Sequence, residues 1–187
     1  MKLLKYENNK LKQQFIFTLP AGMSTCNRIC PGCYAMKSQV RFPAALDYRN
    51  RMLIASQQPD FADRIIAELS TTRRSARTVR LHESGEFYSQ KYISSWLTIA
   101  TALPQFTFYA FTKRLADFNF SKLAALPNFV LINSLQHGGL NYAPLANLRS
   151  NVFTCPATTG HTVTCGITCK YCQTKKAQYN SVQFVVH

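Results

Sequence analysis

The cysteines constrain this chain more than any other feature of its sequence. There are seven, three near the amino terminus and four near the carboxyl terminus: Cys26, Cys30, Cys33, Cys155, Cys165, Cys169 and Cys172. An odd, clustered set of cysteines is a poor disulfide framework, especially behind an amino-terminal segment that lacks the apolar run of a secretory signal. The clustering favours metal ligation in two separate sites.

The first set, Cys26, Cys30 and Cys33, has C-x3-C-x2-C spacing, with a Pro-Gly turn between the last two cysteines. Such a turn bends the chain tightly, because proline fixes φ and glycine permits positive φ. Three thiolates leave one coordination position of a metal centre open, and open sites do chemistry on a ligand. The alternative is a zinc site that a fourth ligand such as His82 completes.

The second set is Cys155, Cys165, Cys169 and Cys172, after which only 15 residues remain. Those residues are too few to build a catalytic barrel behind an open cluster. We therefore expect a closed four-thiolate site, which holds structure or passes electrons. Thiolates bind both zinc and iron–sulfur clusters, so the spacing leaves zinc and a second [4Fe–4S] cluster open.

Apolar segments alternate between strand and helix periodicity along the chain. The predicted strands are 15–19, 78–81, 106–111, 129–132, 152–154 and 182–186, and the predicted helices are 44–57, 61–69, 90–103 and 115–126. We expect Asp60 to cap the helix 61–69 and Ser89 to cap the helix 90–103. This alternation is typical of a parallel sheet with crossover helices. We expect an α/β fold, either a partial (βα) barrel or an open, mostly parallel sheet, because the strands are too few for an eight-stranded barrel.

The chain has 187 residues and contains no linker or low-complexity run, which predicts a single domain over 1–187. Within it we expect an α/β core over 15–150 and a cysteine-rich metal-binding knuckle over 151–187. The 47% apolar content excludes a disordered chain, and polar residues interrupt every stretch long enough to cross a membrane. We therefore expect a cytoplasmic protein without a membrane partner.

The charge is strongly basic, with 22 Lys and Arg against 8 Asp and Glu and a formal net charge of +14. Such a balance favours an anionic partner, most often nucleic acid. Two basic segments carry this expectation: Arg73, Arg74, Arg77 and Arg80, and then Lys170, Lys175 and Lys176 interleaved with Tyr171 and Tyr179. Interleaved aromatic rings could stack on bases, although a solvated basic face has the same pattern.

Polar residues follow the predicted strands, at the end where parallel α/β sheets bind their ligands. These candidate residues are Ser84, Gly85 and Glu86 after the second strand, Lys113 and Arg114 after the third, and Asn133 and Ser134 after the fourth.

The cysteine spacing resembles the motif of the radical S-adenosylmethionine (SAM) proteins, except that Gly32 stands where the family has an aromatic residue. The resemblance implies a [4Fe–4S] cluster on Cys26, Cys30 and Cys33, whose open iron binds the amino and carboxylate groups of SAM. Ser84-Gly85-Glu86 is similar to the segment that these proteins place against the amino group.

The same resemblance assigns roles to the other candidates. Glu86 would then face the SAM ammonium, as charge-assisted pairing requires. Lys113 or Arg114 would face the SAM carboxylate, and Asn133 or Ser134 the ribose. With an electron donor, such a protein cleaves SAM reductively to a 5′-deoxyadenosyl radical that acts on a substrate, here unknown and with nucleic acid among the candidates.

Longer stretches resemble one phage family. LPAGMSTC, CPGCYAMK, RLHESGEFYSQKYISSW, FYAFTKR and the terminal CPA…CxxxCxxC cluster occur in an order that is similar to the "gene product 88" family, which is itself radical-SAM-like in sequence. The sequence thus favours a radical-SAM-type enzyme. The alternative is a non-catalytic, metal-stabilised phage protein that binds nucleic acid.

Overall fold

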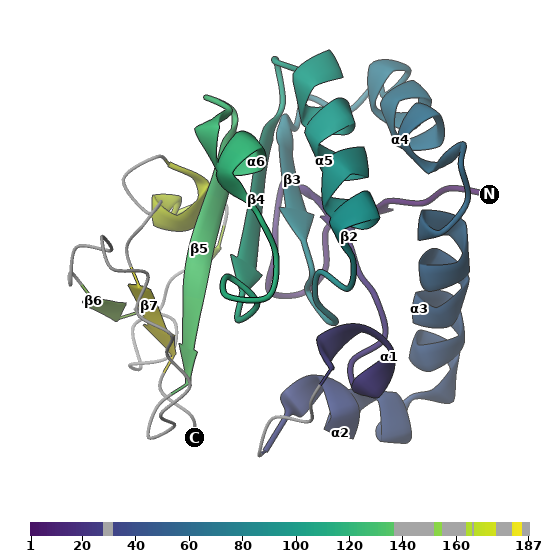
Figure 1. Cartoon of the computed structure of the whole chain (residues 1–187), viewed down its shortest axis with the longest axis vertical. Coiled ribbons are helices and arrows are strands. Elements are labelled where there is room, and N and C mark those ends of the chain that lie inside the picture. Colours follow the sequence, from purple (N-terminus) through teal and green to yellow (C-terminus); the bar gives the residue numbers. More distant parts are fainter. Residues whose placement is uncertain (28–31, 137–151, 155–163, 166, 175–180, 185–187) are drawn as a thin grey trace.

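A computed structural model of the chain describes residues 1–27, 32–136, 152–154, 164–165, 167–174 and 181–184 (Figure 1). The helices are α1 (Met23–Cys26), α2 (Tyr34–Arg41), α3 (Pro43–Ser56), α4 (Phe61–Ser70), α5 (Gln90–Ala102) and α6 (Ser121–Ala125), with a 3-10 turn η2 (Tyr171–Gln173). The strands are β1 (Lys5–Tyr6), β2 (Phe15–Phe17), β3 (Thr78–Leu81), β4 (Thr107–Thr112), β5 (Phe129–Gln136), β6 (Val152–Thr154) and β7 (Ser181–Phe184).

The described strands form one sheet in the order β1-β2-β3-β4-β5-β7-β6. Only the β1–β2 pair is antiparallel, and every other neighbouring pair is parallel. The fold is therefore α/β with a mostly parallel sheet, as predicted. Of the two expected architectures, the described strands form the open sheet, because the strand order runs from an edge at β1 to an edge at β6. The carboxyl ends of β2, β3 and β4 meet at one end of this sheet, which we call the carboxyl edge.

The two faces of the sheet are covered differently. Helices α3, α4, α5 and α6 lie on one face (Figure 1), where they bury an aromatic core with Trp96 of α5 and Phe61 of α4 at its centre. Alternate side chains of β4 point to the other face, which we call the open face. There Tyr109 and Phe111 form a small apolar cluster with Val130 and Ile132, against which Tyr171 and Cys172 pack. In the part of the chain that the structure describes, no helix is long and apolar enough to cross a membrane.

Most predicted elements are present, with bounds that shift by a few residues at most. The predicted cap of α5 is confirmed, since the Ser89 hydroxyl accepts a hydrogen bond from the Tyr92 N–H at 3.1 Å. The predicted cap of α4 is wrong, because the Asp60 side chain makes no capping hydrogen bond. The prediction missed β1, α1, α2 and η2. The last predicted strand, 182–186, is β7, and its residues beyond Phe184 lie outside the described ranges.

The predicted helix over 115–126 is wrong in its first half, because only Ser121–Ala125 is helical. The Gln90 side chain from α5 explains the difference. Its amide accepts from the Asn119 N–H and donates to the Asn119 carbonyl, both at 3.0 Å. These bonds occupy both backbone groups of Asn119, so that residue cannot join a helical ladder.

Candidate functional site

The carboxyl edge gathers the predicted site residues from three neighbouring strands. The cysteine loop follows β2, the Ser84–Glu86 segment follows β3, and Lys113 and Arg114 follow β4. Asn133 and Ser134 differ from the prediction, because they lie inside the longer strand β5 and pair with Ser181 and Val182 of β7. Asn133 is nonetheless opposite Thr112, the last residue of β4, and is therefore level with that strand's end.

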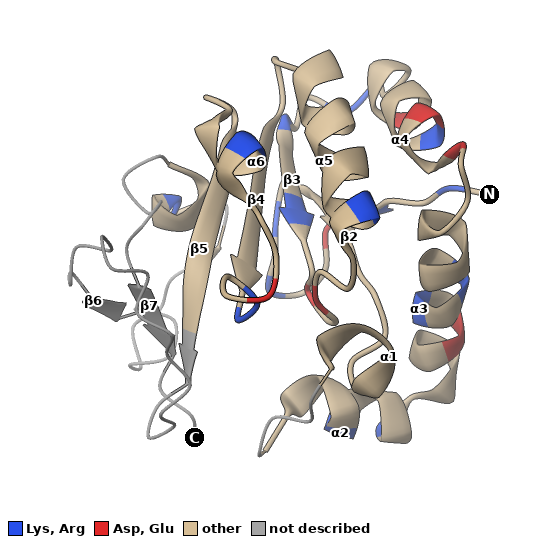
Figure 2. Ribbon diagram, in the orientation of Figure 1, with Lys and Arg blue, Asp and Glu red and all other residues tan. Residues whose placement is uncertain are grey.

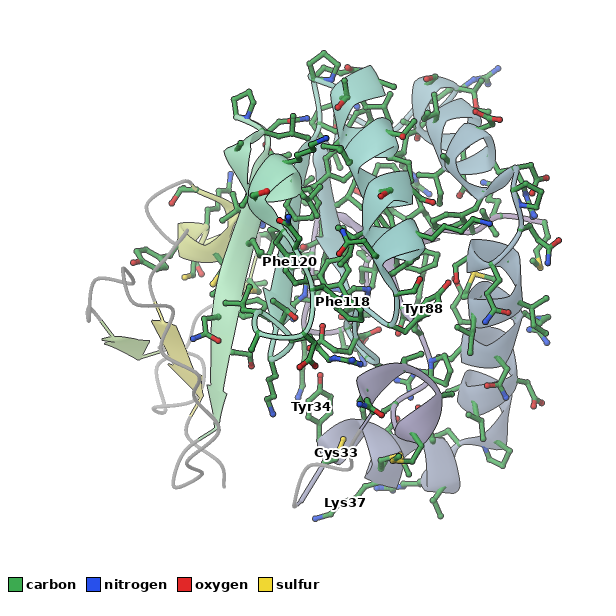
Figure 3. All side chains as sticks on the ribbon, in the orientation of Figure 1. Cys33, Tyr34, Lys37, Tyr88, Phe118 and Phe120 are labelled. Carbon is green, nitrogen blue, oxygen red and sulfur yellow. The ribbon has the colours of Figure 1, made fainter. Side chains whose placement is uncertain are left out.

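Two short helices frame the cysteine loop. Cys26 is the last residue of α1, after which Asn27 adopts a left-handed φ of 55° that ends the helix. Cys33 is the residue just before α2. Both sulfurs are half-buried, and Figure 3 shows Cys33 and Tyr34 below the carboxyl edge. Cys30 lies outside the described residues.

Buried hydrogen bonds tie both ends of this loop together. The Gln39 side chain of α2 accepts from the Ala21 N–H at 2.6 Å and donates to the Ala21 carbonyl at 3.2 Å. Buried Arg49 of α3 donates to the Ala35 carbonyl at 3.5 Å and to Gln39 at 3.4 Å. Ala21, two residues before α1, is thereby fixed to α2, and α2 to α3.

Arg114 fixes α1 to the sheet. Its guanidinium donates to the Thr25 carbonyl, next to Cys26, at 3.0 Å, and pairs with Asp117 at 2.5 Å. The same group stacks on Phe118, at 4.8 Å from the ring centre. These contacts occupy the Arg114 side chain within the protein.

Glu86 is buried between two strand ends. Its Oε2 accepts from the Lys113 N–H at 2.8 Å, and its Oε1 accepts from the Phe87 N–H at 2.9 Å. Burial raises the Glu86 pKa to about 7, although the hydrogen bonds and Arg114 oppose this shift. Glu86 therefore fastens the end of β3 to the end of β4.

Gly85 is required by the backbone at this position. Its φ is +80°, and a Cβ atom there would lie 2.6 Å from the Leu19 Cβ and 2.9 Å from the Leu19 carbonyl oxygen. The adjacent Ser84 carbonyl accepts from the Leu19 N–H at 2.9 Å, whereas the buried Ser84 Oγ has no hydrogen-bond partner. A buried hydroxyl without a partner is costly unless a ligand satisfies it.

His82 is buried, and its backbone adopts a left-handed conformation with φ of 58°. Its Nε2 lies 3.0 Å from the Tyr92 hydroxyl, and its ring meets Phe87 edge-on at 4.4 Å. Burial, assisted by Arg80, lowers the His82 pKa to about 3, so the ring is neutral at physiological pH. This packing places His82 among aromatic side chains of the core.

The second cysteine set lies toward the other end of the sheet. The Cys165 backbone forms a β-bridge with Leu11, and the Cys165 carbonyl accepts from the Lys12 N–H at 3.1 Å. Leu11 and Lys12 lie just before β2. The Cys165 backbone also forms a β-bridge with that of Cys169, and Cys172 packs on the open face. Because Cys26 follows β2 whereas Cys165 lies beside the residues before it, the two sets do not form one centre. Cys155 lies outside the described residues.

The cysteine loop has the donor chemistry that an iron–sulfur cluster needs. Cys26 and Cys33 are half-buried, the ends of the loop are held by buried hydrogen bonds, and an unsatisfied hydroxyl, Ser84 Oγ, lies at the neighbouring strand end. Among the described residues no three His, Cys, Asp or Glu side chains come together as a metal site. One cysteine of each predicted set, Cys30 and Cys155, falls outside those residues. The donor set fits a cluster on thiolates.

The predicted basic run packs on the protein's own aromatic rings. Arg74 lies over Tyr6 at 4.3 Å, and Arg77 lies over Phe106 at 5.3 Å from the ring centre. Figure 2 shows Lys and Arg spread over α2, α3, α4, α5, α6 and β3 rather than gathered on one element. Lys175, Lys176 and Tyr179 lie outside the described residues. Binding of nucleic acid stays a prediction.

Residues 1–151 match the family described as Gene product 88. The chain belongs to this family. The Gene product 88 match confirms the resemblance to this phage family, and it includes the front cysteines and the Ser84–Glu86 segment but ends before Cys155. No curated protein and no solved structure matches the chain.

The sequence did not single out the residues that anchor the cysteine loop. Gln39 and Arg49 are both buried, although polar side chains are usually exposed. One signal was available for Gln39. It lies four residues after Ala35 and shares its buried helix face, so the helical period of α2 assigns this glutamine to the interior.

Proposed function

We propose that this chain is a radical-SAM-type iron–sulfur protein in which Cys26, Cys30 and Cys33 hold a [4Fe–4S] cluster. The observation that carries the proposal is the position of the cysteine loop. It follows the first of four consecutive, adjacent, parallel strands, and Ser84-Gly85-Glu86 follows the next strand. Ligand sites of parallel α/β sheets lie at this edge, which supports a bound cofactor there.

When bound, such a cluster transfers an electron from an external donor to SAM and cleaves it reductively. The chain's own residues would hold the cysteine loop in place and would bind and orient SAM. Gln39 joins α2 to the segment before α1, Arg114 holds α1 against the sheet, and Glu86 fastens the two strand ends. The unsatisfied Ser84 hydroxyl suits the SAM amino group, and the Lys113 ammonium suits its carboxylate.

The candidate residues for a contact with the SAM ribose lie on β5. Asn133 is level with the end of β4, and Ser134 follows it along the strand. Both side chains are half-buried and can form hydrogen bonds, and because consecutive strand residues point to opposite faces, one of the two, Asn133 or Ser134, would contact the SAM ribose.

We also propose that Cys155, Cys165, Cys169 and Cys172 bind a second metal, either zinc or a [4Fe–4S] cluster. The backbone β-bridge between Cys165 and Cys169 and the packing of Cys172 against the apolar cluster of the open face support a compact site. Because this segment also bonds to Lys12, the metal would hold the carboxyl-terminal segment against the sheet.

Binding of SAM to the cluster-loaded full chain tests the proposal. SAM is titrated into the anaerobically reconstituted and reduced protein while the electron paramagnetic resonance spectrum of the cluster is followed. We expect a saturable change in the spectrum, and its loss in Cys33→Ser. Ser94→Ala, which alters an exposed hydroxyl of α5, serves as the matched control and should bind as the wild type does. A cluster spectrum that SAM leaves unchanged would overturn the proposal.

A further inference from the structure

Arg80 occupies the open face of the sheet, away from the helices. Its guanidinium carbon lies 4.2 Å from the centre of the Phe111 ring and 5.1 Å from that of Tyr109. The Arg80 Nε donates to the Leu81 carbonyl at 3.1 Å. These contacts fix the guanidinium over two rings, and Arg80 also forms a side-chain hydrogen bond with Tyr109 that opposes the rise in the Tyr109 pKa caused by burial. A guanidinium carries five N–H donors, so further donors remain for a ligand.

No carboxylate neutralises this guanidinium within the described chain. The ion pairs found there are Arg64–Asp60 and Arg114–Asp117. Arg80 is half-buried, and a partly desolvated charge is costly unless an opposite charge or hydrogen bonds compensate it. Arg77 on the same segment provides the contrast. It is exposed, and it donates to the carbonyls of Arg74 at 2.6 Å and Ala76 at 2.9 Å.

A second unsatisfied polar group lies nearby on the same face. Phe15, Phe17 and Leu19 belong to the core beneath the helices, so alternation assigns Ile16 and Thr18 to the open face. Ile16 is paired with Arg80, and Thr18 therefore lies one step from Arg80 toward the carboxyl edge. Thr18 is only 3% exposed, and its Oγ1 has no hydrogen-bond partner.

We propose that Arg80 and Thr18 form a binding site for an oxyanion, the carboxylate or phosphate group of a small-molecule ligand, on the open face of the sheet. The guanidinium supplies two donors in a fixed plane, which matches both groups, and the threonine hydroxyl supplies a third. The rings of Phe111 and Tyr109 hold the guanidinium in place before the ligand arrives. This site goes beyond the proposed function, since anion binding there requires neither a cluster nor SAM.

Anion titrations of the full-length protein test the site. The backbone amide signals of Leu81 and Phe111 are followed by nuclear magnetic resonance during separate additions of sodium phosphate and sodium acetate, at an ionic strength held constant with sodium chloride. We expect saturable shifts. Saturation by phosphate alone identifies a phosphate ligand, and saturation by acetate alone identifies a carboxylate. Shifts that fail to saturate with both anions would overturn the proposal.

Three variants connect the binding to these residues. Arg80→Gln should weaken anion binding by on the order of 10- to 100-fold, because it removes charge-assisted hydrogen bonds. Arg77→Gln removes the same charge from the neighbouring aromatic stack and should leave the affinity unchanged. Thr18→Val removes an unpartnered hydroxyl without changing shape, so it should weaken anion binding while the melting temperature of the ligand-free protein does not fall. Wild-type affinity in Arg80→Gln, or in Thr18→Val if Arg80→Gln does not fold, contradicts the site.

Discussion

The Glu86 carboxylate and the Lys113 backbone join two strand ends through a hydrogen bond of 2.8 Å. The other carboxylate oxygen accepts from Phe87, so both oxygens of this buried group are engaged by the protein. The acidic residue of the Ser-Gly-Glu segment thus builds the carboxyl edge itself. A SAM amino group that binds there would meet a carboxylate that the backbone already orients.

The buried carboxyl of Glu86 makes stability depend on pH in a defined direction. Its pKa is raised from 4.5 to about 7, so the folded protein keeps a proton that the unfolded chain releases. This contribution is fully present below about pH 4.5, falls as the pH rises, and is lost above about pH 7. The shift corresponds to a change on the order of 3 kcal/mol.

The measurement compares the free energies of unfolding of the wild type and Glu86→Gln across this range. Because the variant cannot titrate at this position, subtracting the two curves removes the other ionisable groups. The wild type should lose stability relative to the variant between pH 4.5 and 7. A difference that does not change with pH would show that Glu86 titrates normally.

Gly85→Ala should destabilise the protein by about 2–5 kcal/mol, from a left-handed backbone and an overpacked contact. The added Cβ would lie 2.6 Å from the Leu19 Cβ. Gly32→Ala is the matched control, since Gly32 has φ of +67° but nothing within 4 Å of the added atom. It should cost only about 1–2 kcal/mol. Chemical denaturation measures both, and equal losses would exclude the close contact.

Gln39→Leu should lower the free energy of unfolding by at least about 2 kcal/mol, because it leaves the buried N–H and carbonyl of Ala21 unsatisfied. Gln58→Ala removes an exposed amide that donates to the Ile54 carbonyl, and it should change stability by less than about 0.5 kcal/mol. Urea titration distinguishes the two. A Gln39→Leu variant as stable as the control would mean that the cysteine loop is anchored in another way.

Cys169→Ser should remove the carboxyl-terminal metal and lower the melting temperature together, since a closed site supplies folding energy. Thr174→Val, which removes an exposed hydroxyl that donates to the Tyr171 carbonyl, should retain the metal. Metal analysis and thermal denaturation of both variants give the answer. Unchanged metal content and melting temperature in Cys169→Ser would show that these cysteines form no site.

Much of the sheet could be predicted from the sequence, because strand and helix periodicities are local. The strand 78–81 and the cap at Ser89 depend on neighbouring residues, and both were correct. The helix predicted over 115–126 was wrong because Gln90, far away in sequence, binds the backbone of Asn119. Local periodicity carries no information about such a contact.

The candidate site was predictable to a similar extent. The cysteine spacing and the Ser-Gly-Glu segment are visible in the sequence, and the parallel sheet brings their strand ends together. The anchoring by Gln39 and the position of Arg80 over Phe111 depend on tertiary packing. The sequence alone could not locate these polar side chains, because burial and partners are set by the whole fold.

The iron and acid-labile sulfide contents of the anaerobically reconstituted protein test the central claim most directly. Replacement of Cys33 by serine identifies how much of the iron and sulfide is bound by the front cysteines, since any metal at the carboxyl-terminal cysteines remains. The account predicts that Cys33→Ser loses about four iron and four sulfide per chain relative to the wild type, as one [4Fe–4S] cluster requires. A wild-type protein that stays colourless, and whose front cysteines hold zinc that Cys33→Ser releases, would contradict it.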